Sequence, residues 1–503
     1  MIAPADTARA GLPVILGSDG MPIGRGGYDA VSHTNRRRAP AILLQSEDRE
    51  LLPERRRAMV ATARDVRRNY SIAAWAIRRH LDYVSTFTFH SRTGNPDLDG
   101  EIERLMAWWA RPQNFDVAGR HGLARMTRLI EAHALVDGDV LVLKMRDGRV
   151  QTIEGDRVRS PYGGLPKELA NLPPEFMDAE PWPGSGRLIH GVHVDPWGKP
   201  IAFCICKRVG LSGFLFEKLL PASWCLQHGY FDRIDQVRGV TPLSSALNDF
   251  RDCYEAKEYA LAKLKISQLF GLIFFRKSAE EMGIVEPQPD TTADDEEGPK
   301  YQVDPGKGPF KLELDPGDDA KWLETGTPAT ESQEFIAATI EAALKSLDLP
   351  MSFYDGRRTN FFGSRGELNH YLASAKIKRQ NLRDMLDELT VWRLGAFVDD
   401  GDLKLPAGMK VEGLHWNWVH AGLPWWNPVQ EVSANVMALA AGLTSRQRIC
   451  LETGDDFDEI VDEQKYEKGR LEGAGLSSDV KPPNITISED RSGTAPAKEE
   501  AAA

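Results

Sequence analysis

The segment from Arg238 to Lys277 constrains the fold more than any other stretch of the chain. Thr241 is a good N-cap residue, and Pro242 follows at the first helical position, where its missing N–H costs no hydrogen bond. Apolar residues then recur at close to helical spacing, which predicts a helix of about 25 residues. These residues are Leu243, Leu247, Phe250, Tyr254, Leu261 and Leu264. An apolar run, 269–275, follows the helix. Taken alone, the pattern fits a long helix in the core of any domain. The segments before and after it are therefore needed to infer its function.

Composition describes an ordinary folded protein. With 503 residues, 42% hydrophobic and 27% charged, the chain can bury a large core and is expected to form two to four domains. A formal net charge of −12 argues against a sequence-independent DNA coat, but it is compatible with a protein past which DNA slides. Five cysteines, an odd number, suit a reducing compartment with free thiols.

No targeting or membrane segment is predicted. The first residues are interrupted by Asp6, Arg9 and prolines, and the longest apolar run is far too short to cross a bilayer. The protein is therefore expected to stay in a cytosol. Cys204 and Cys206 alternate with apolar residues, so we expect them on one face of a strand; a metal there would need two further ligands.

The N-terminal part is predicted to be helical after a flexible arm, 1–44. Helices are expected over 47–90, 100–110 and 120–136, with Ser71 capping the second half of the first range. Trp108 and Trp109 are expected to anchor the core.

A small β-rich subdomain is predicted around 138–235. Asp147-Gly148 separates two apolar runs and is a strong hairpin signal. A loop rich in Pro and Gly, 160–186, follows it, and a second hairpin is expected from Leu188–Val194 and Ile201–Lys207, joined across 195–199.

The remaining chain is predicted to be mostly helical, so the fold class is α+β. A segment rich in Pro and acidic residues, 278–320, interrupts the pattern before a helix that starts at Thr330 and ends at Pro350. After the polar loop 354–360, a capping box of Ser364 and Glu367 predicts a long helix to Phe397. The last helices are expected at 429–441, 445–453 (with a Thr444/Gln447 capping box) and 456–470, before a disordered tail, 476–503.

No catalytic residue, metal site or cofactor is predicted. The nearest approach to a phosphate-binding loop, Gly191 to Gly198-Lys199, has the wrong spacing and reads as a hairpin turn. His190 and His193 are three apart on an expected strand and would face opposite sides. A Gly-x-Ser-x-Gly motif is absent from the sequence.

Basic and polar residues near 357–379 are the candidates for contact with DNA phosphates. A solvated helix face is the competing interpretation, and the scarcity of interleaved aromatic residues argues against base stacking. The candidates are Arg357, Arg358, Thr359, Asn360, Lys376 and Arg379, with Lys378 and Arg383 on the same predicted helix.

The order of several short motifs over 45–475 resembles the lambda-type family of bacteriophage portal proteins. Each motif is weak alone, and their order gives the resemblance its specificity. They are Arg64 to Ala73, the 188–207 hairpin with His228, Gln236 to Val240, Leu347 to Pro350 with Ser364-Arg365, and the series from Trp416 and Pro428 to Gly442–Ser445 and Glu452–Asp455.

The resemblance implies a mostly helical α+β portal fold with wing, stem, clip and crown regions. The implied wing is 45–249, with 250–277 descending to the stem and 278–320 as the clip. The implied later parts are a stem return helix at 321–350, a tunnel-type loop at 351–362, a long helix and wing at 363–427, and crown-like helices at 428–475. The apolar run before the clip becomes a surface for subunit packing, with Leu269, Leu272, Phe274 and Phe275 as candidates.

The resemblance also implies partners and a location. Identical subunits would form a ring, commonly dodecameric, at one capsid vertex of the virion, after assembly in the host cytoplasm. Double-stranded DNA would pass through it during packaging and ejection, and terminase, which supplies the ATPase, would dock on it. Major capsid, scaffold and head-completion or adaptor proteins would be further partners, and no membrane or cofactor is implied.

Two alternatives from other classes stay open at the level of sequence. A phage-encoded DNA-processing enzyme such as a nuclease would need a carboxylate or His-metal cluster, which the sequence does not display. A helical adaptor that binds proteins without DNA would need no ring.

Overall fold

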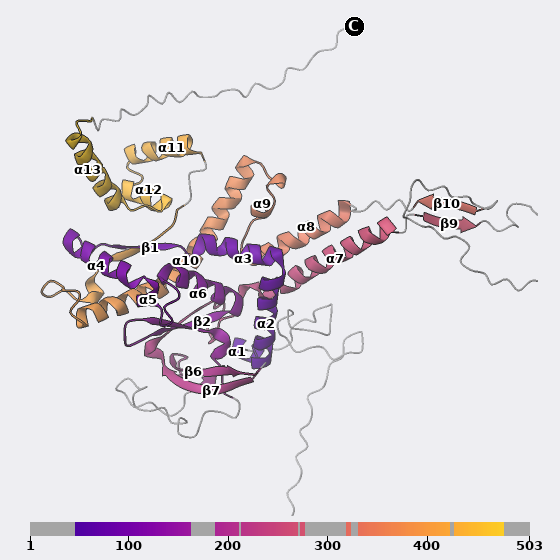
Figure 1. Cartoon of the computed structure of the whole chain (residues 1–503), viewed down its shortest axis with the longest axis horizontal. Helices are drawn as coiled ribbons and strands as arrows, with labels where there is room; N and C mark the ends of the chain where they lie inside the picture. Colours follow the sequence, from indigo (N-terminus) through magenta and orange to yellow (C-terminus); the bar gives the residue numbers. More distant parts are fainter. Residues whose placement is uncertain are drawn as a thin grey trace, which may run out of the picture. The chain divides into compact units, whose positions relative to one another are not determined.

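The computed structural model of the chain is drawn in Figure 1. It describes residues 46–161, 187–210, 213–269, 272–276, 318–322, 330–422 and 427–476. The chain divides into two compact units, Met1–Trp418 and Val419–Ala503. The predicted arm, residues 162–186 of the predicted loop, most of the 278–320 segment and residues 477–503 of the predicted tail lie outside the described residues.

The first unit begins with helices, as the sequence predicts, but the predicted helical range 47–90 is wrong at its end, where residues Phe87–Ser91 form strand β1. The helices are α1 (Glu47–Glu50), α2 (Pro53–Asn69), α3 (Ser71–Val84), α4 (Pro96–Trp109), α5 (Pro112–Phe115) and α6 (Leu123–Asp137). Ser71 is the first residue of α3 and Tyr70 stands at the cap position without a side-chain bond, so the predicted Ser71 cap is wrong. Trp109 is buried and donates its indole N–H to the carbonyl of Gly148 at 2.8 Å. Trp108 is 44% exposed, because each residue of α4 turns about 100° around the helix axis and carries Trp108 away from the side of buried Trp109, so its predicted role as a core anchor is wrong.

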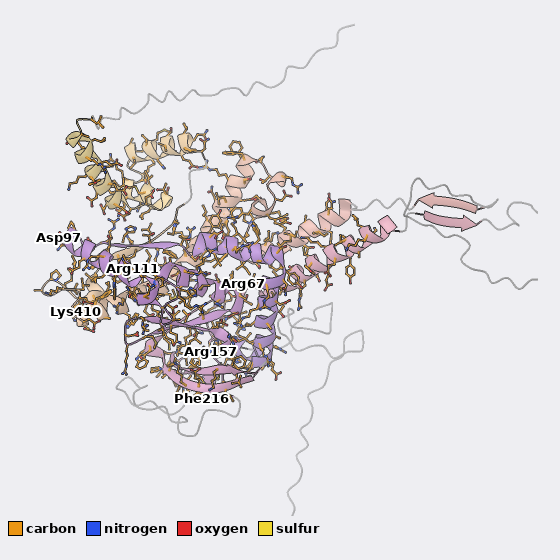
Figure 2. All side chains as sticks on the ribbon, in the orientation of Figure 1. Arg67, Asp97, Arg111, Arg157, Phe216 and Lys410 are labelled. Atoms are coloured by element: carbon orange, nitrogen blue, oxygen red, sulfur yellow. The ribbon has the colours of Figure 1, made fainter. Side chains whose placement is uncertain are left out.

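The β-rich subdomain is confirmed and holds two antiparallel sheets. One sheet has the order β3-β2-β8 and the other has the order β4-β5-β6-β7. Their strands are β2 (Asp139–Lys144), β3 (Val150–Glu154), β4 (Arg187–Ile189), β5 (Val192–Val194), β6 (Pro200–Val209), β7 (Gly213–Pro221) and β8 (Cys225–Gly229), with short 3-10 turns η2 (Gly155–Arg157) and η5 (Ala222–Trp224). Figure 2 labels Arg157 beside the second sheet and Phe216 on β7.

Strand β2 is buried on both faces, which explains its uninterrupted apolar sequence. Val140 and Val142 belong to a core formed with α4, α6 and α10 (Phe361–Asp399), and Leu141 and Leu143 belong to a core formed with the second sheet. The Asp147-Gly148 hairpin joins β2 to β3 as predicted, and Gly148 has the positive φ of +78° that such a turn requires.

The second predicted hairpin contains one more strand and one more turn than the sequence indicates. Leu188–Val194 is itself a hairpin, because a turn at His190 and Gly191, with φ of +48° and +89°, separates β4 from β5. The 195–199 turn then joins β5 to β6, as expected. Cys204 and Cys206 are both buried on β6, where the register with β7 shifts at Ile205/Cys206. Strand β7 was not expected from the sequence.

The long helix that follows starts later than predicted. Thr241 does act as a cap, accepting from the backbone N–H of Leu243 at 3.2 Å, but it caps the 3-10 turn η6 (Pro242–Ser245). The helix α7 (Leu247–Leu269) then begins, and it lies alongside α8 (Thr330–Lys345) in Figure 1. The apolar run beyond it contains β9 (Leu272–Arg276), which pairs with β10 (Asp318–Trp322).

The next helix is longer at its start than predicted. Helix α10 begins at Phe361, and Asn360 is its cap, accepting from the N–H of Gly363 at 2.7 Å. Ser364 lies inside the first turn, so the predicted Ser364/Glu367 capping box is wrong. The short helix α9 (Met351–Tyr354) and turn η7 (Gly356–Arg358) precede it; η8 (Val411–Gly413) and β11 (Trp416–His420), which pairs with β1 (Phe87–Ser91), follow it.

The second unit contains the three predicted C-terminal helices. They are α11 (Pro428–Ala440), α12 (Arg446–Thr453) and α13 (Phe457–Gly473). Ser445, and not the predicted Thr444, caps α12 by accepting from the N–H of Arg448 at 3.3 Å. The fold as a whole is mostly helical α+β, as the sequence predicts.

Candidate functional site

The predicted DNA-facing loop consists of short helical turns, and its polar side chains form hydrogen bonds within the loop. The side chain of Asp355 accepts from the backbone N–H of Arg357 at 3.1 Å and caps η7. Asp355 also receives the Arg357 guanidinium in a forked ion pair, with Nε at 2.9 Å and a terminal nitrogen at 3.0 Å. The Arg357 side chain is 90% exposed, so the loop presents a cation that is already paired. The backbone of Arg358 ends η7, and its side chain lies outside the described residues.

The two polar candidates in this loop position the helix that follows. Asn360 caps α10, and the Thr359 hydroxyl donates to the carbonyl of Asn360 at 3.2 Å. The Ser364 hydroxyl in turn donates to the Thr359 oxygen at 3.4 Å. These side chains therefore fix where α10 begins, whatever else they contact.

The basic residues of α10 divide into exposed and buried groups. Lys376 is exposed, whereas Lys378 donates to the Asp348 carboxylate at 2.8 Å and to the carbonyl of Leu347 at 3.0 Å. Arg379 is only 6% exposed, and its Nε donates to the carbonyl of Tyr83 at 2.6 Å. Burial gives Arg379 a structural role in the subunit, which corrects its place among the candidates for DNA contact.

Helices α7 and α8 leave the core together. Near their bases, Phe250 and Cys253 of α7 pack in one core cluster with Ile340 and Leu344 of α8. Beyond Cys253 the apolar side chains turn outward: Tyr259 is 73% exposed, Leu261 is 52% exposed and Phe335 is 63% exposed. We call residues 254–269 and 330–339 the limb. Exposed apolar side chains gathered on one element are typical of an interaction surface.

The four predicted subunit-packing residues lie at the distal end of the limb and beyond it. Leu269 is the last residue of α7, and Leu272, Phe274 and Phe275 lie on β9 opposite Trp322, Ala320 and Asp319 of β10. The structure thus turns the apolar run into a paired strand. Their side chains lie outside the described residues, and their role in packing stays a prediction.

A buried ionic cluster fixes the entrance to α7. The Arg238 guanidinium makes five hydrogen bonds, two of them to Asp139 at 2.6 and 2.7 Å, and the others to the carbonyls of Gly155 (2.7 Å), His190 (2.8 Å) and Val158. Asp139 also accepts from Arg56 at 2.7 Å and from the N–H of Gly239 at 2.9 Å. We call Arg56, Asp139, Gly155, Arg238 and Gly239 the Arg238 cluster.

Electrostatics hold Asp139 charged inside this cluster. Burial alone would raise the pKa of Asp139, but Arg238 and Arg56 outweigh it and lower the pKa to about 2. Gly239 is required because a Cβ there would lie 2.1 Å from the carbonyl oxygen of Gly138. The Gln236-to-Val240 motif therefore serves to join the sheet, α2 and the start of α7.

A second buried polar cluster lies around Glu131 of α6. Its carboxylate faces His80 Nε2 at 3.1 Å and His228 Nε2 at 2.9 Å, and it accepts from the Tyr230 hydroxyl at 2.5 Å. Burial would raise the pKa of Glu131, but the bonds to His228 and His80 hold it well below its usual range. All three partners come from elements that surround α6, so the cluster ties α3, α6 and β8 together. It lies away from solvent, which argues against a catalytic role.

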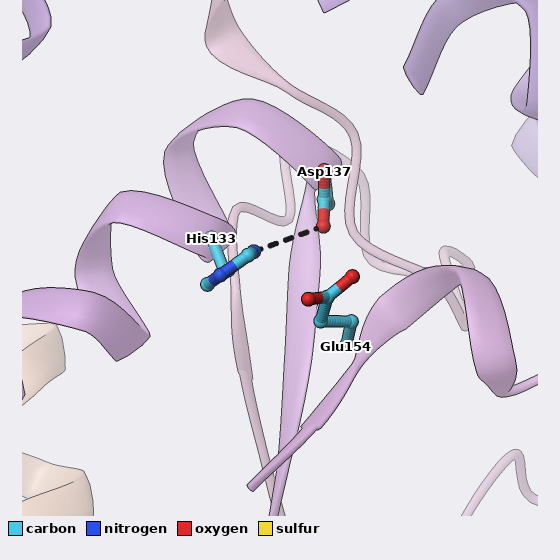
Figure 3. Close-up of side chains that lie close together, drawn as sticks. All are labelled: His133, Asp137 and Glu154. Carbon is cyan, nitrogen blue, oxygen red and sulfur yellow. Dashed lines mark hydrogen bonds and ion pairs between the residues drawn. The ribbon is translucent and has the colours of Figure 1, made fainter. Parts of the chain in front are cut away.

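One group of side chains in the described residues has the geometry of a metal site. His133, Asp137 and Glu154 place a ligand atom each within 4.8 Å of one another (Figure 3). His133 Nδ1 lies 3.2 Å from Asp137, which is four residues along α6, and this spacing could have signalled the pair from sequence. However, Arg64 donates to Asp137 at 2.6 and 2.8 Å and to Glu154 at 2.9 Å. An arginine inside the group supplies the counter-charge, so these residues form an ion-pair network and do not suit a cation.

The profile of the family "Phage portal protein, lambda family" matches residues 34–377. No curated protein matches the sequence significantly. No helix among the described residues is long and apolar enough to cross a membrane.

Similar solved structures come from gene transfer agent particles. The neck of the empty particle, solved with C6 symmetry, gives a TM-score of 0.46 at 12% identity, covering 78% of this chain and 93% of that chain. The neck of the native particle, solved with C12 symmetry, gives 0.41 at 13% identity with the same coverage. The virion of the native particle gives 0.43 at 13% identity, again with the same coverage.

Proposed function

Because the chain belongs to the lambda family of phage portal proteins, its function is that of a portal protein, and we propose that twelve copies assemble into the ring at one capsid vertex. Portal proteins are structural proteins of the virion, so we propose no enzymatic activity for the chain. DNA passes through the ring during packaging and ejection. The ring also docks terminase, capsid and scaffold proteins, and later the head-completion proteins, after assembly in the host cytoplasm.

The exposed apolar side chains of the limb carry this proposal. Tyr259, Leu261 and Phe335 stand on two helices whose bases are fixed in the subunit core. Burying such side chains against a neighbouring copy would stabilise the assembly by roughly 1.5–3 kcal/mol for each fully buried residue. A contact of this kind between different faces of identical subunits generates a ring when its rotation closes.

We also propose an assignment for the remaining regions of the family architecture. In this proposal α7 and α8 form the stem, and the segment between β9 and β10 forms the clip that meets terminase. The loop 351–362 borders the tunnel in front of α10, the wing holds the sheets, and the second unit forms the crown. The antiparallel pairing of β9 with β10 supports this, because it brings the two ends of the intervening segment together.

Electron microscopy of the purified full-length protein tests ring formation. We expect perforated rings from the unmodified chain, and their loss on Leu261→Asp, which would bury an unpaired charge at the contact. The matched control is Leu215→Asp on β7, a leucine that is 55% exposed outside the limb and should leave the rings intact. Intact rings from Leu261→Asp would overturn the limb contact, and monomers from the unmodified chain, also with capsid and scaffold proteins present, would overturn the ring.

The channel surface is proposed to bind DNA weakly. The chain is net acidic at −12, and Arg357 is already paired with Asp355, so few cations are free to release counterions from DNA. Asp355→Asn frees Arg357 and should raise both the affinity of the ring for duplex DNA and its salt dependence. The exposed carboxylate of Asp384, replaced by Asn, is the control. Tight and steeply salt-dependent binding of duplex DNA by the unmodified ring would overturn the proposal that the channel surface binds DNA weakly.

The nuclease alternative has less support. Of the described residues, the one group with metal-ligand geometry contains Arg64. A cleavage assay on duplex DNA with added Mg²⁺ or Mn²⁺ should show no activity above that of a His133→Ala variant. Metal-dependent cleavage that is lost in this variant would favour the enzyme.

A further inference from the structure

A small cavity beside the Arg238 cluster is lined by four arginines. It has a volume of about 60 Å³, and the first two turns of α2, η2 and the β4–β5 turn supply its walls. The arginines are Arg56, Arg57, Arg159 and Arg238. One water needs roughly 10–15 Å³, so the cavity can take a larger polar group.

Negative charge in this wall is scarce and already engaged. Asp156 is the one carboxylate in the lining, and it accepts from Arg208 at 2.7 Å and from Arg64 at 3.3 Å. Asp139, behind the wall, is shared by Arg238 and Arg56. Arg56, Arg57 and Arg159 therefore each have N–H groups that no carboxylate among the described residues accepts from.

Those three arginines differ from Arg238, whose five N–H groups are all used. Arg56 is 7% exposed, uses two N–H groups on Gly155 and Asp139, and has a buried Nε with no partner among the described residues. Arg159 lies with its guanidinium 4.2 Å from the centre of the Phe214 ring. Within the described chain, neither Arg57 nor Arg159 donates a side-chain hydrogen bond to a protein acceptor. A buried Nε–H without a partner, on an arginine that lines a cavity, indicates that a further acceptor belongs there.

We propose that this cavity binds a free tetrahedral oxyanion such as inorganic phosphate. Arg56, Arg57 and Arg159 donate to its oxygens, and the start of α2 adds the partial positive charge of a helix N-terminus. Leu52 at the cap position gives α2 no side-chain cap, which leaves that end open to an anion. Burial lowers the pKa of His190, which lies at the same wall.

The cations also disfavour one another when no anion is bound. Burial and then the charge of Arg238 lower the pKa of Arg56 to about 10, and burial, with a contribution from Arg57, lowers the pKa of Arg159. An oxyanion among them relieves this repulsion and joins α2 to η2 and to the β4–β5 turn. The proposed site is therefore a stabilising ion site between α2, η2 and the β4–β5 turn of one subunit.

Titration calorimetry of the full-length protein with inorganic phosphate tests the site, with chloride at matched ionic strength as the reference. We expect saturable binding of one phosphate per chain, and a rise of the melting temperature with phosphate concentration. Arg57→Gln and Arg159→Gln should each weaken the affinity by about tenfold, since each removes a charged hydrogen bond. These two positions are chosen because the Arg56→Gln variant loses the Asp139 contact and is expected to unfold.

Arg68→Gln is the matched control, because Arg68 is exposed at the other end of the same helix. Its phosphate affinity should equal that of the unmodified chain. Absence of saturable binding, or equal weakening in all three variants, would overturn the site. A short oligonucleotide with a terminal phosphate is the second arm; binding of it without binding of free phosphate would also overturn the proposal.

Discussion

The Arg238 cluster and the limb follow one another along the chain, yet they reverse the usual distribution of side chains. In the cluster, charged groups of Arg238, Asp139 and Arg56 are buried and bonded to one another. In the limb, the apolar side chains of Tyr259 and Leu261 are exposed. The ion pairs of the cluster form within one subunit, since Arg238 and Arg56 both contact Asp139. In our proposal, a second chain covers the exposed apolar surface of the limb.

This difference teaches where stability and assembly reside. Changes in the cluster should unfold the subunit, since a charge left alone in the core is costly. Changes in the limb should leave the subunit stable and alter its association. The predictions that follow test this division, from the largest effect on stability to the smallest.

Removing the central cation should have the largest effect. Arg238→Gln leaves Arg56 as the one cation that contacts Asp139 among the described residues, and we expect the free energy of unfolding to fall by roughly 3–5 kcal/mol. Urea unfolding followed by circular dichroism measures it. Arg128→Gln is the control, because Arg128 pairs with Asp82 at the surface and should cost no more than about 1 kcal/mol. An equal loss of unfolding free energy in the two variants would contradict the proposed importance of the buried Arg238 cluster for subunit stability.

Acid should weaken the cluster next. The pKa of Asp139 is lowered to about 2 in the folded chain, against roughly 3.9 when unfolded. A lowered folded pKa contributes stability that is complete above the unfolded value and is lost as pH falls towards 2. We expect this loss, on the order of 2 kcal/mol, between about pH 4 and pH 2.

The variant Asp139→Asn isolates this contribution, since other carboxylates titrate in the same range. Its unfolding free energy should be lower at pH 7 but should decline less steeply over the acid range than that of the unmodified chain. Parallel pH profiles would show that Asp139 does not titrate as described.

The cap of α10 should have a smaller effect. Asn360→Ala removes the acceptor for the N–H of Gly363 and should cost about 1 kcal/mol. Ser364→Ala, at the position that the sequence favoured as the cap, should cost less than about 0.5 kcal/mol. The midpoints of urea unfolding of the two variants measure this difference. A larger loss of stability in Ser364→Ala than in Asn360→Ala would favour Ser364 as the cap of α10.

The limb should show the smallest effect on stability. Leu261→Asp is expected to change the free energy of unfolding of the isolated subunit by less than about 0.5 kcal/mol, because Leu261 is half exposed there. The same variant should nevertheless fail to form rings. A large loss of stability in the monomer would mean that Leu261 packs within its own subunit. The limb would then contribute to subunit stability, as the Arg238 cluster does.

The sequence by itself determined the helical and β-rich segments, the Asp147-Gly148 hairpin, the family and the existence of a long helix before an insertion. These follow from local patterns, since periodicity, turn residues and motif order are visible along the chain. Several caps were misplaced by one to four residues. Neighbouring polar residues such as Asn360 and Ser364 are equally good candidates, and only the backbone conformation selects between them.

Only the tertiary structure decided which polar residues are buried and which apolar residues are not. Arg379 looked like one more cation on a helix face, but the fold places it against the carbonyl of Tyr83. Asp139 and Arg238 are 99 residues apart in the chain, and Arg56 is a further 83 residues from Asp139, so no local pattern could join them. The physical reason is that burial and charge pairing depend on distances through space. The helix after Arg238 was visible in the sequence; its division into a buried base and an exposed limb was not.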